Sequence, residues 1–374
     1  MESQQYRWQP NHGWEPAPPN GGSVDLVLVF AGPEALRNGP ALAELRGAFP
    51  GATLFGCSSA GEIHGTRVTD GALVATAVRF AHTRHRGAIA RVGEYPGSEA
   101  LGRAIADQLA DDGLRHVLVL SDGLRVNGSK LVQGLENRLP PGVTVSGGLS
   151  GDGGKFRKTF VLLDGEPETG LVAAVGLYGN GLRVGCGSLG GWDPFGPERL
   201  ITRSEANVLH ELDGRSVLSL YKEYLGEHAD GLPATALLFP LSLRARNAEH
   251  RVVRTVLSVD EKDQSMTFAG DMPSGWYARF MKANFDRLID GALGAAKRSE
   301  AGLRHSRPEL AILISCYGRK MVLQDLVEEE VEAVREVLGG SATITGMYSY
   351  GEISPFAPGA SCELHNQTMT LTTI

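Results

Sequence analysis

Two glycine-rich turns combine the residue types that hold a small polar ligand. They span residues 56–63 and 346–353, and each closes on a Gly-Glu-Ile step. Glycines let the backbone approach a ligand closely, while hydroxyl groups and aromatic faces supply specific contacts. We therefore predict a ligand pocket at these turns. The alternative is that the glycines only permit tight turns and that Glu62 and Glu352 cap local backbone groups.

Arg319 is the residue best suited to hold a charged ligand. It follows an apolar run that ends at Cys316, and ligands of open α/β sheets bind beside the carboxyl ends of strands. A guanidinium group there can hold a carboxylate through two parallel hydrogen bonds. In that case, replacing Arg319 by Ala should weaken binding without unfolding the protein. The alternative is a structural ion pair with a nearby acidic residue.

The predicted ligand-binding residues come from both turns and from the segment around Arg319. The full set is Gly56, Cys57, Ser58, Ser59, Gly61, Glu62, Cys316, Arg319, Tyr348, Tyr350, Gly351 and Glu352. A cysteine nucleophile needs a base within hydrogen-bond reach, and no histidine is placed beside either cysteine by the sequence. We therefore expect a protein that is not an enzyme, with a cysteine-dependent enzyme as an alternative.

Histidine and glycine patterns bear on cofactors. Haem requires a histidine with a free ring nitrogen, and His64, directly after the first turn, is our candidate metal ligand. The sequence lacks a Cys-x-x-Cys-His motif, so any haem would be held non-covalently. Residues 151–155 resemble a phosphate-binding loop but lack its glycine spacing and the hydroxyl residue after the lysine, which excludes a nucleotide site of that kind.

The predicted site turns belong to a pattern that occurs three times. Each copy has an apolar run, a helical segment, a second strand that enters a glycine-rich turn, and a closing strand. The apolar runs are 24–30, 116–123 and 310–318, and the helical segments are 35–49, 129–139 and 325–338. Short, uniformly apolar runs are typical of strands covered on both faces. Further helices are expected at 98–112 and 275–301.

This pattern predicts an α/β fold of repeated β-α-β-β units. We expect two mixed sheets flanked by helices, with a four-layer αββα stack as one arrangement. The first 22 residues are rich in Pro, Gly, Asn and Gln and are predicted to be disordered. The remaining boundaries are predicted at 23–185 for an amino-terminal domain, 186–270 for a connecting region and 271–374 for a carboxy-terminal domain. The connecting region should contain a helix at 215–225 and hairpins near residues 213–214 and 260–263.

Composition excludes several classes of partner. The chain of 374 residues has a formal net charge of −7, and its lysines and arginines form no basic stripe, so nucleic acid is not an expected partner. No run of 18 apolar residues occurs, so we expect no membrane insertion. Four widely spaced cysteines indicate neither a disulfide framework nor a zinc site and favour the cytoplasm.

Four short motifs make the chain resemble the FIST family, named for F-box and intracellular signal transduction. They are FGCSSAGEI at 55–63, SCYGR at 315–319, GMYSYGEI at 346–353 and LHNQT at 364–368, and the similarity extends over residues 24–374. The resemblance implies a FIST N-terminal and a FIST C-terminal half. It also implies a sensory domain that detects a small molecule.

The resemblance implies that the signal passes to a separate output protein such as a histidine kinase. Amino acids are among the ligands proposed for the family, and some bacterial members bind haem and respond to nitric oxide. A haem-based nitric oxide sensor and an amino-acid receptor without haem therefore both stay open. The ligand and the cofactor are not fixed by the sequence.

Overall fold

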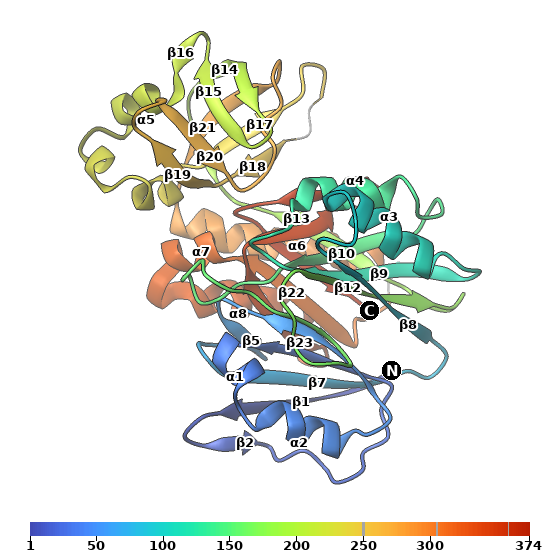
Figure 1. The fold of residues 1–374 in the computed structure, drawn as a ribbon. Coiled ribbons are helices and arrows are strands. Elements are labelled where there is room, and N and C mark those ends of the chain that lie inside the picture. Colours follow the sequence, from blue (N-terminus) through green and yellow to red (C-terminus); the bar gives the residue numbers. More distant parts are fainter. Residues whose placement is uncertain (249–250, 304–305, 358) are drawn as a thin grey trace.

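The computed structural model describes residues 1–374 with the exception of 249–250, 304–305 and 358. Figure 1 shows a core that contains both termini and a smaller lobe, residues 193–282, beside it. Within the described ranges the strands form four sheets, three in the core and one in the lobe. The mixed α/β class is thus confirmed, the predicted pair of sheets is wrong, and the αββα layering is not confirmed.

Three copies of one β-α-β-β unit build the core. In each copy the second strand runs parallel to the first on one side, and the third runs antiparallel on the other. The first copy consists of β3 (Leu26–Ala31), α1 (Pro33–Arg37), α2 (Ala41–Ala48), β4 (Thr53–Ser58) and β7 (Leu73–Arg79). The second consists of β9 (Leu114–Ser121), α4 (Gly128–Glu136), β10 (Thr144–Leu149) and β12 (Leu171–Tyr178). The third consists of β22 (Leu310–Cys316), α7 (Tyr317–Leu323), η3 (Gln324–Leu326), α8 (Val327–Leu338), β23 (Thr343–Ser349) and β26 (Met369–Thr373).

An additional strand borders the third strand of every copy. These antiparallel neighbours are β1 (Glu2–Gln9) beside β7, β8 (Arg84–Arg91) beside β12, and β13 (Gly185–Leu189) beside β26. The prediction that residues 1–22 are disordered is therefore wrong, since β1 is a full strand and β2 (Gly13–Glu15) pairs with it. Tyr6 and Trp8 occupy alternate positions of β1, and both are buried in an apolar cluster. An antiparallel strand can be stable with only one of its faces buried, so this polar segment can still form a strand.

Each copy also donates one strand to a neighbouring sheet. The donated strands are β5 (Glu62–His64) to β23, β24 (Gly351–Pro355) to β10, and β11 (Val161–Leu163) to β4. Two short strands, β6 (Arg67–Thr69) and β25 (Cys362–His365), then extend two of the sheets. Copy one thus donates to copy three, three to two, and two to one. The exchange is cyclic, so no copy completes its own sheet.

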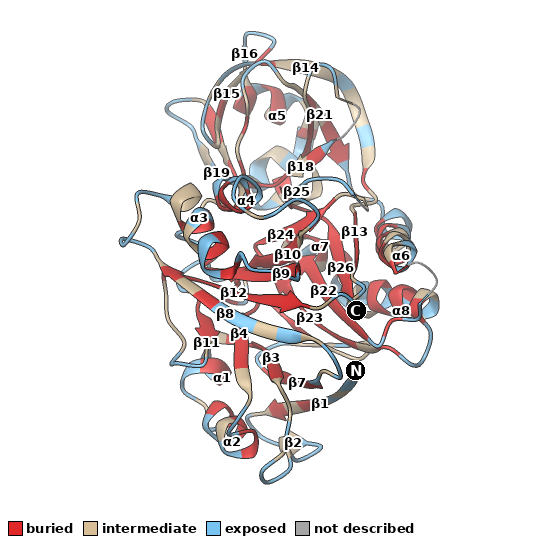
Figure 2. Cartoon of the chain, turned by 90° about the vertical axis from the view of Figure 1, so that its right-hand side faces the viewer, coloured by how far each residue is buried: buried red, intermediate tan, exposed pale blue. Residues whose placement is uncertain are grey.

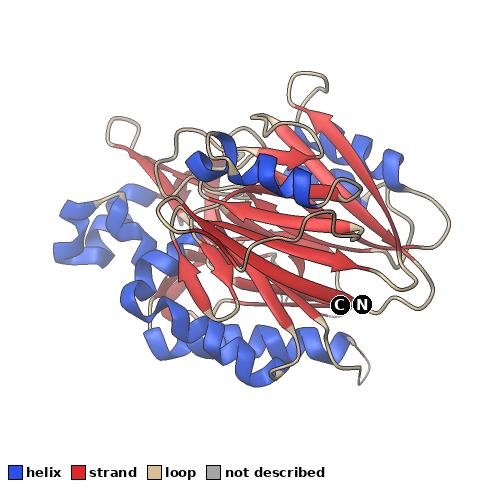
Figure 3. Ribbon diagram, turned by 90° about the horizontal axis from the view of Figure 1, so that it is seen from below, coloured by secondary structure: helices blue, strands red, loops and turns tan. Residues whose placement is uncertain are grey.

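Apolar side chains fill the space between the three core sheets. On the first strands, Leu28, Leu120 and Ile312 point into one shared central cluster, while their chain neighbours belong to clusters beneath the outer helices. Both faces of these strands are therefore buried, as the uniform apolar runs predicted. Figure 2 shows the strands of the core as mostly buried, and Figure 3 shows the helices around the outside of the sheets.

As predicted, one helix precedes the first strand of the second copy and another precedes that of the third copy. The helix before the third copy begins later than predicted. α3 (Ser98–Leu109) packs on α4, and α6 (Phe285–Gly302) packs on α8. The predicted start at residue 275 is wrong, because residues before α6 form β21 (Tyr277–Lys282). Ala278 and Phe280 alternate into the core of the lobe, and the helix begins only where the Asn284 side chain accepts from the Arg287 amide.

The lobe is an eight-stranded sheet with a core of its own. Its elements are β14 (Asp193–Glu205), β15 (Val208–Leu212), β16 (Arg215–Ser216), α5 (Val217–Leu225), η1 (Gly226–Gly231), η2 (Ala234–Leu238), β17 (Leu241–Arg244), β18 (Val252–Arg254), β19 (Val256–Asp260), β20 (Ser265–Phe268) and β21. The two predicted hairpins are β15–β16 and β19–β20. Of the described helices, none is long and apolar enough to cross a membrane.

One glycine in each second strand has no room for a side chain. A Cβ atom at Gly56, Gly147 or Gly346 would lie 1.8–1.9 Å from a carbonyl oxygen of the neighbouring first strand. The three contacts are equivalent, which places these glycines at the same position of the three copies. Side-chain volume at this position would push the two parallel strands apart.

We predict that Gly346→Ala lowers the free energy of unfolding by at least about 2 kcal/mol, because a backbone atom must move to admit the methyl group. The matched control is Gly47→Ala in α2, where nothing lies within 4 Å of the added methyl group. Alanine there should stabilise the helix by about 0.5–1 kcal/mol. Chemical denaturation of both variants measures the difference, and equal stabilities would contradict the steric argument.

Candidate functional site

The three glycine-rich turns meet at one place in the core. We call this place the turn ring and define it as residues 56–62, 147–153 and 346–352. Each turn donates a backbone hydrogen bond to the next turn, and three of these bonds, one from each turn, close a ring. The donor–acceptor pairs are Ala60–Tyr348 at 2.9 Å, Gly151–Ser58 at 3.0 Å and Tyr350–Leu149 at 3.0 Å. The two predicted site turns are therefore neighbours, and a third turn contacts both of them.

The predicted turn residues are brought together, but all of them are buried. They are Gly56, Cys57, Ser58, Ser59, Gly61, Glu62, Tyr348, Tyr350, Gly351 and Glu352. Their hydroxyl groups are used inside the fold: the Ser58 hydroxyl donates to the Gly151 carbonyl at 2.7 Å and accepts from the Phe160 amide at 2.9 Å. The ring is thus a satisfied polar structure.

Glu62 and Glu352 occupy equivalent places in the first and third copies. Each carboxyl accepts from a serine three residues earlier, Ser59 or Ser349, and from the backbone amide of the residue just before the third strand. Both side chains are fully buried, and this burial raises the pKa of each carboxyl to about 8, although the hydrogen bonds act in the opposite direction. Each carboxyl is therefore mostly protonated at neutral pH.

Asp122 supplies the carboxylate of the second copy, and sequence reasoning missed it. It is buried, and its Oδ2 accepts from the amide of Gly170, which precedes β12, at 2.6 Å. Its Oδ1 accepts from the amides of Leu124 and Arg125 at 2.8 and 3.0 Å. The signal was available, since Asp122 directly follows an apolar strand, but it comes from the turn after the first strand and not the second.

Arg319 forms a structural ion pair, which was the alternative left open by the sequence. Its guanidinium group is fully buried, and Nε and Nη2 donate to Glu330 Oε2 at 3.0 and 2.7 Å. Nη1 donates to the Gly190 carbonyl, and Nη2 also reaches the Leu288 carbonyl at 2.7 Å. Glu330 in turn accepts from the Tyr348 hydroxyl at 2.6 Å, so this network ends in the turn ring.

Cys57 and Cys316 lack the exposure and the lowered pKa of a catalytic thiol. Cys57 and Cys316 are buried, and burial raises the pKa of both thiols far above the usual range. A nucleophilic cysteine requires a lowered pKa and access to substrate. The Sγ atom of Cys57 lies 3.2 Å from Met347 Sδ in an apolar setting. The geometry gives no support to the alternative of a cysteine-dependent enzyme.

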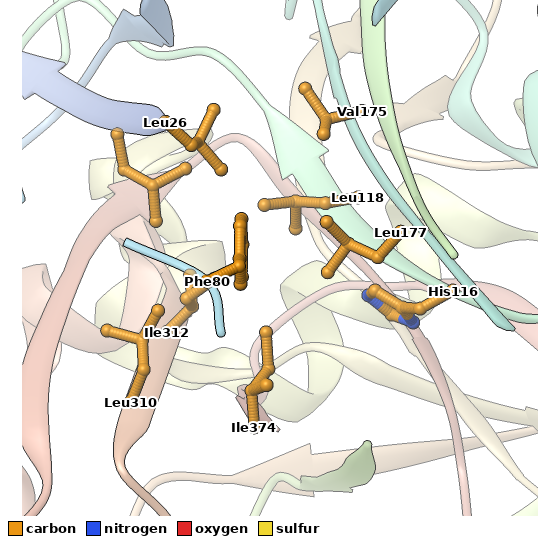
Figure 4. A pocket seen from close by; sticks show the side chains of 10 residues that line it. Leu26, Phe80, His116, Leu118, Val175, Leu177, Leu310, Ile312 and Ile374 are labelled. Atoms are coloured by element: carbon orange, nitrogen blue, oxygen red, sulfur yellow. The ribbon is translucent and has the colours of Figure 1, made fainter. Parts of the chain in front are cut away.

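The surroundings of His116 do not fit haem, and His64 lies in a different setting. His64 is half-buried, and burial together with the charge of Arg7 lowers its pKa. His116 lines an apolar cavity between the sheets (Figure 4), but both of its ring nitrogens already have hydrogen-bond partners, Thr144 and Ser146. The cavity measures about 10 Å³, which is room for one water molecule and far too small for a porphyrin. Among the described residues, no cluster of three or more His, Cys, Asp or Glu side chains could hold a metal ion.

A larger, polar cavity lies where the lobe joins the core. The chain enters the lobe at the start of β14 and leaves it between β21 and α6. The cavity of about 300 Å³ lies at both of these crossings, and we call it the hinge pocket. Its lining residues are Asp193, Lys282, Ala283, Asn284, Phe285 and Asp286. The Gly190 and Leu288 carbonyls that Arg319 holds lie on the core side of the same two crossings.

We predict that Glu62 and Glu352 together lower the stability of the protein as the pH rises from about 4.5 to 8. Glu62 and Glu352 have folded-state pKa values above their unfolded value, so the folded state binds extra protons in this range. Each group then contributes a slope of about 1.4 kcal/mol per pH unit, and the contribution is complete only below the unfolded pKa. Denaturation at several pH values should show a flatter slope for the Glu62→Gln, Glu352→Gln double variant. Exposed Glu227→Gln is the control, and an unchanged slope in the double variant would contradict the assignment.

We predict that Arg319→Ala destabilises the protein by about 3–5 kcal/mol, because it leaves the buried Glu330 carboxylate without its counter-charge. This corrects the expectation that the variant would fold normally. Arg203→Ala is the control, since Arg203 forms an exposed pair with Glu211 and such pairs contribute at most about 1 kcal/mol. Wild-type stability of Arg319→Ala in chemical denaturation would exclude the structural role.

Comparison with known proteins agrees with the motifs. The family model described as the FIST N domain matches residues 25–215, and the one described as the FIST C domain matches residues 218–355. An uncharacterized protein of Methanocaldococcus jannaschii is 23% identical over 207 residues, and the match covers 51% of this chain and 39% of that protein. The chain thus spans well under two thirds of that relative. Because the two family models cover most of its length, the protein belongs to the FIST family of sensory-domain proteins.

Proposed function

We propose that this FIST protein is a receptor for a small polar ligand that binds in the hinge pocket. The observation that carries the proposal is the position of this pocket at both crossings between lobe and core. Ligand sites occur preferentially where two parts of a protein meet, because binding there can bias their relative placement. The hinge pocket is also open to solvent, unlike the turn ring.

The lining of the hinge pocket favours a zwitterion. Lys282 offers an ammonium group for a carboxylate, and Asp286 offers a carboxylate for an ammonium group. Asp193 is partly occupied, since it pairs with Arg287 at 3.2 Å. The ring of Phe285, which is half exposed, supplies an apolar wall. An α-amino acid satisfies all of these features, which supports the amino-acid receptor that the family resemblance implies.

The Arg319 network supports a route from the hinge pocket to the turn ring. Arg319 holds a carbonyl group on each crossing, Glu330 holds Arg319, and Tyr348 donates to Glu330. The Tyr348 carbonyl is itself an acceptor in the ring. A ligand that shifts the two crossings would therefore act on the ring. In this proposal the predicted turn residues and Arg319 transmit binding and do not contact the ligand.

The proposed receptor signals to a separate protein in the cytoplasm, for which a histidine kinase is the class implied by the family. Haem is not part of the proposal, because both ring nitrogens of His116 have hydrogen-bond partners and the apolar cavity beside it is too small for a porphyrin. An absorption spectrum of the purified protein tests this point. A Soret band would favour the haem-based sensor over the amino-acid receptor.

The test is titration calorimetry with each of the protein amino acids. We predict that at least one binds, and that Lys282→Ala and Asp286→Asn each weaken the binding about 10-fold to 150-fold, since each removes a charge-assisted hydrogen bond. The control is Lys262→Ala, which removes an exposed lysine from the β19–β20 hairpin of the same lobe. Binding that survives both pocket substitutions would place the ligand elsewhere, and absence of binding by every amino acid would overturn the ligand class.

A further inference from the structure

The loop that follows the second turn presents an aromatic ring among positive charges. Lys155, Phe156, Arg157 and Lys158 are all exposed, and half of the Phe156 surface is accessible. The ion pairs formed among the described residues involve none of the three cations. Three cations thus lie within four consecutive residues of a chain whose net charge is −7.

The loop is held rigidly in a strained conformation. Asp152 accepts hydrogen bonds from the backbone amides of Phe156, Arg157 and Lys158 at 2.7–2.9 Å, and from the Tyr350 hydroxyl. The φ angle of Phe156 is +51°, a region that bulky residues rarely adopt. Strain of this kind persists where the surrounding structure enforces it, and it is concentrated at functional sites.

Aromatic neighbours fix the ring of Phe156 and widen the apolar surface. Phe156 stacks on Tyr350 with centroids 4.4 Å apart and meets Tyr317 edge-on at 6.2 Å. Tyr317 and Met321 are four residues apart on α7 and therefore share one face of that helix. Met321 is 44% exposed. Aromatic, methionine and arginine side chains are enriched in the cores of protein interfaces.

The backbone of this loop cannot serve as a phosphate cradle. Such a cradle needs free amide groups that point at the anion. The amides of residues 156–158 are taken by Asp152, and the Gly154 amide donates to the Tyr350 hydroxyl at 3.1 Å. The Asp152 carboxylate would also repel a phosphate. Recognition must therefore use the outward side chains.

We propose that the loop 152–158, together with Tyr317 and Met321, docks an acidic protein segment. Carboxylates of the segment pair with Lys155, Arg157 and Lys158, and an apolar side chain of the segment packs on Phe156 and Tyr317. The surface is built on the turn ring through Tyr350. The proposal does not depend on the identity of the ligand or on the hinge pocket.

The test uses a fluorescein-labelled peptide of Glu-Leu-Glu-Glu repeats and fluorescence anisotropy with the full chain. We expect saturable binding that weakens with salt, and a loss of at least about tenfold in the Lys155→Glu, Arg157→Glu variant. The matched control is Lys262→Glu, Lys297→Glu, which changes the net charge equally at exposed positions. Phe156→Gly should also weaken binding about tenfold or more while the fold survives, because glycine adopts this φ angle without strain.

Two other anionic ligands distinguish an acidic protein segment from a general anion. Oligothymidine DNA and phosphatidylserine vesicles should bind more weakly than the acidic peptide. Binding of either one that is as strong, and is unchanged by Phe156→Gly, would overturn the proposal in favour of a general anion-binding surface. Absence of peptide binding, or equal losses in the matched control, would overturn it as well. Circular dichroism of each variant verifies folding.

Discussion

The ring of three backbone hydrogen bonds between the glycine-rich turns is the constraint on which the rest of the structure depends. At this ring each copy of the β-α-β-β unit sends a strand into the next sheet, so every sheet needs residues from two copies. The chain can therefore not be divided into two halves that each complete their own core. The division between the FIST N and FIST C matches, near residues 215–218, falls inside the lobe and leaves the three-copy core intact in neither part. The lobe is inserted between β13, which borders the sheet of the third copy, and α6, which precedes the first strand of that copy.

The sequence predicts the copies well because their signals are local. A few consecutive residues are enough to recognise an all-apolar strand, a helix, or the glycine at which two parallel strands come close together. The sequence does not show which sheet an exchanged strand joins. β5 and β24 follow the same Gly-Glu-Ile pattern, and nothing in this pattern identifies the strand with which each one pairs. The error at residues 275–284 has a similar origin. The apolar positions of β21 fit a helix as well as a strand in a short window, and only packing in the lobe decides between them.

The candidate site shows a different limit of sequence reasoning. Glycine, serine, tyrosine and glutamate in one turn predict a polar pocket, but the same residues are what a buried crossing of three turns needs. Glycine allows close approach, and serine and tyrosine satisfy buried carboxyl groups. Burial distinguishes the two cases, and burial depends on distant segments. Arg319 illustrates this: its partner Glu330 lies in an acidic run that reads as a solvated helix face, yet that one glutamate points inward and is fully buried.

Two groups of side chains contact the turn ring at tyrosines that are two residues apart. The Arg319–Glu330 pair holds the Tyr348 side chain, and Asp152 with Phe156 holds the Tyr350 side chain. The Tyr348 carbonyl and the Tyr350 amide both take part in ring hydrogen bonds, so a shift of either tyrosine strains the same short segment. The proposed ligand and the proposed acidic partner would thus act on the same element. Coupling between two binding sites is reciprocal, so a partner whose affinity depends on the ligand must change the affinity for the ligand by the same factor.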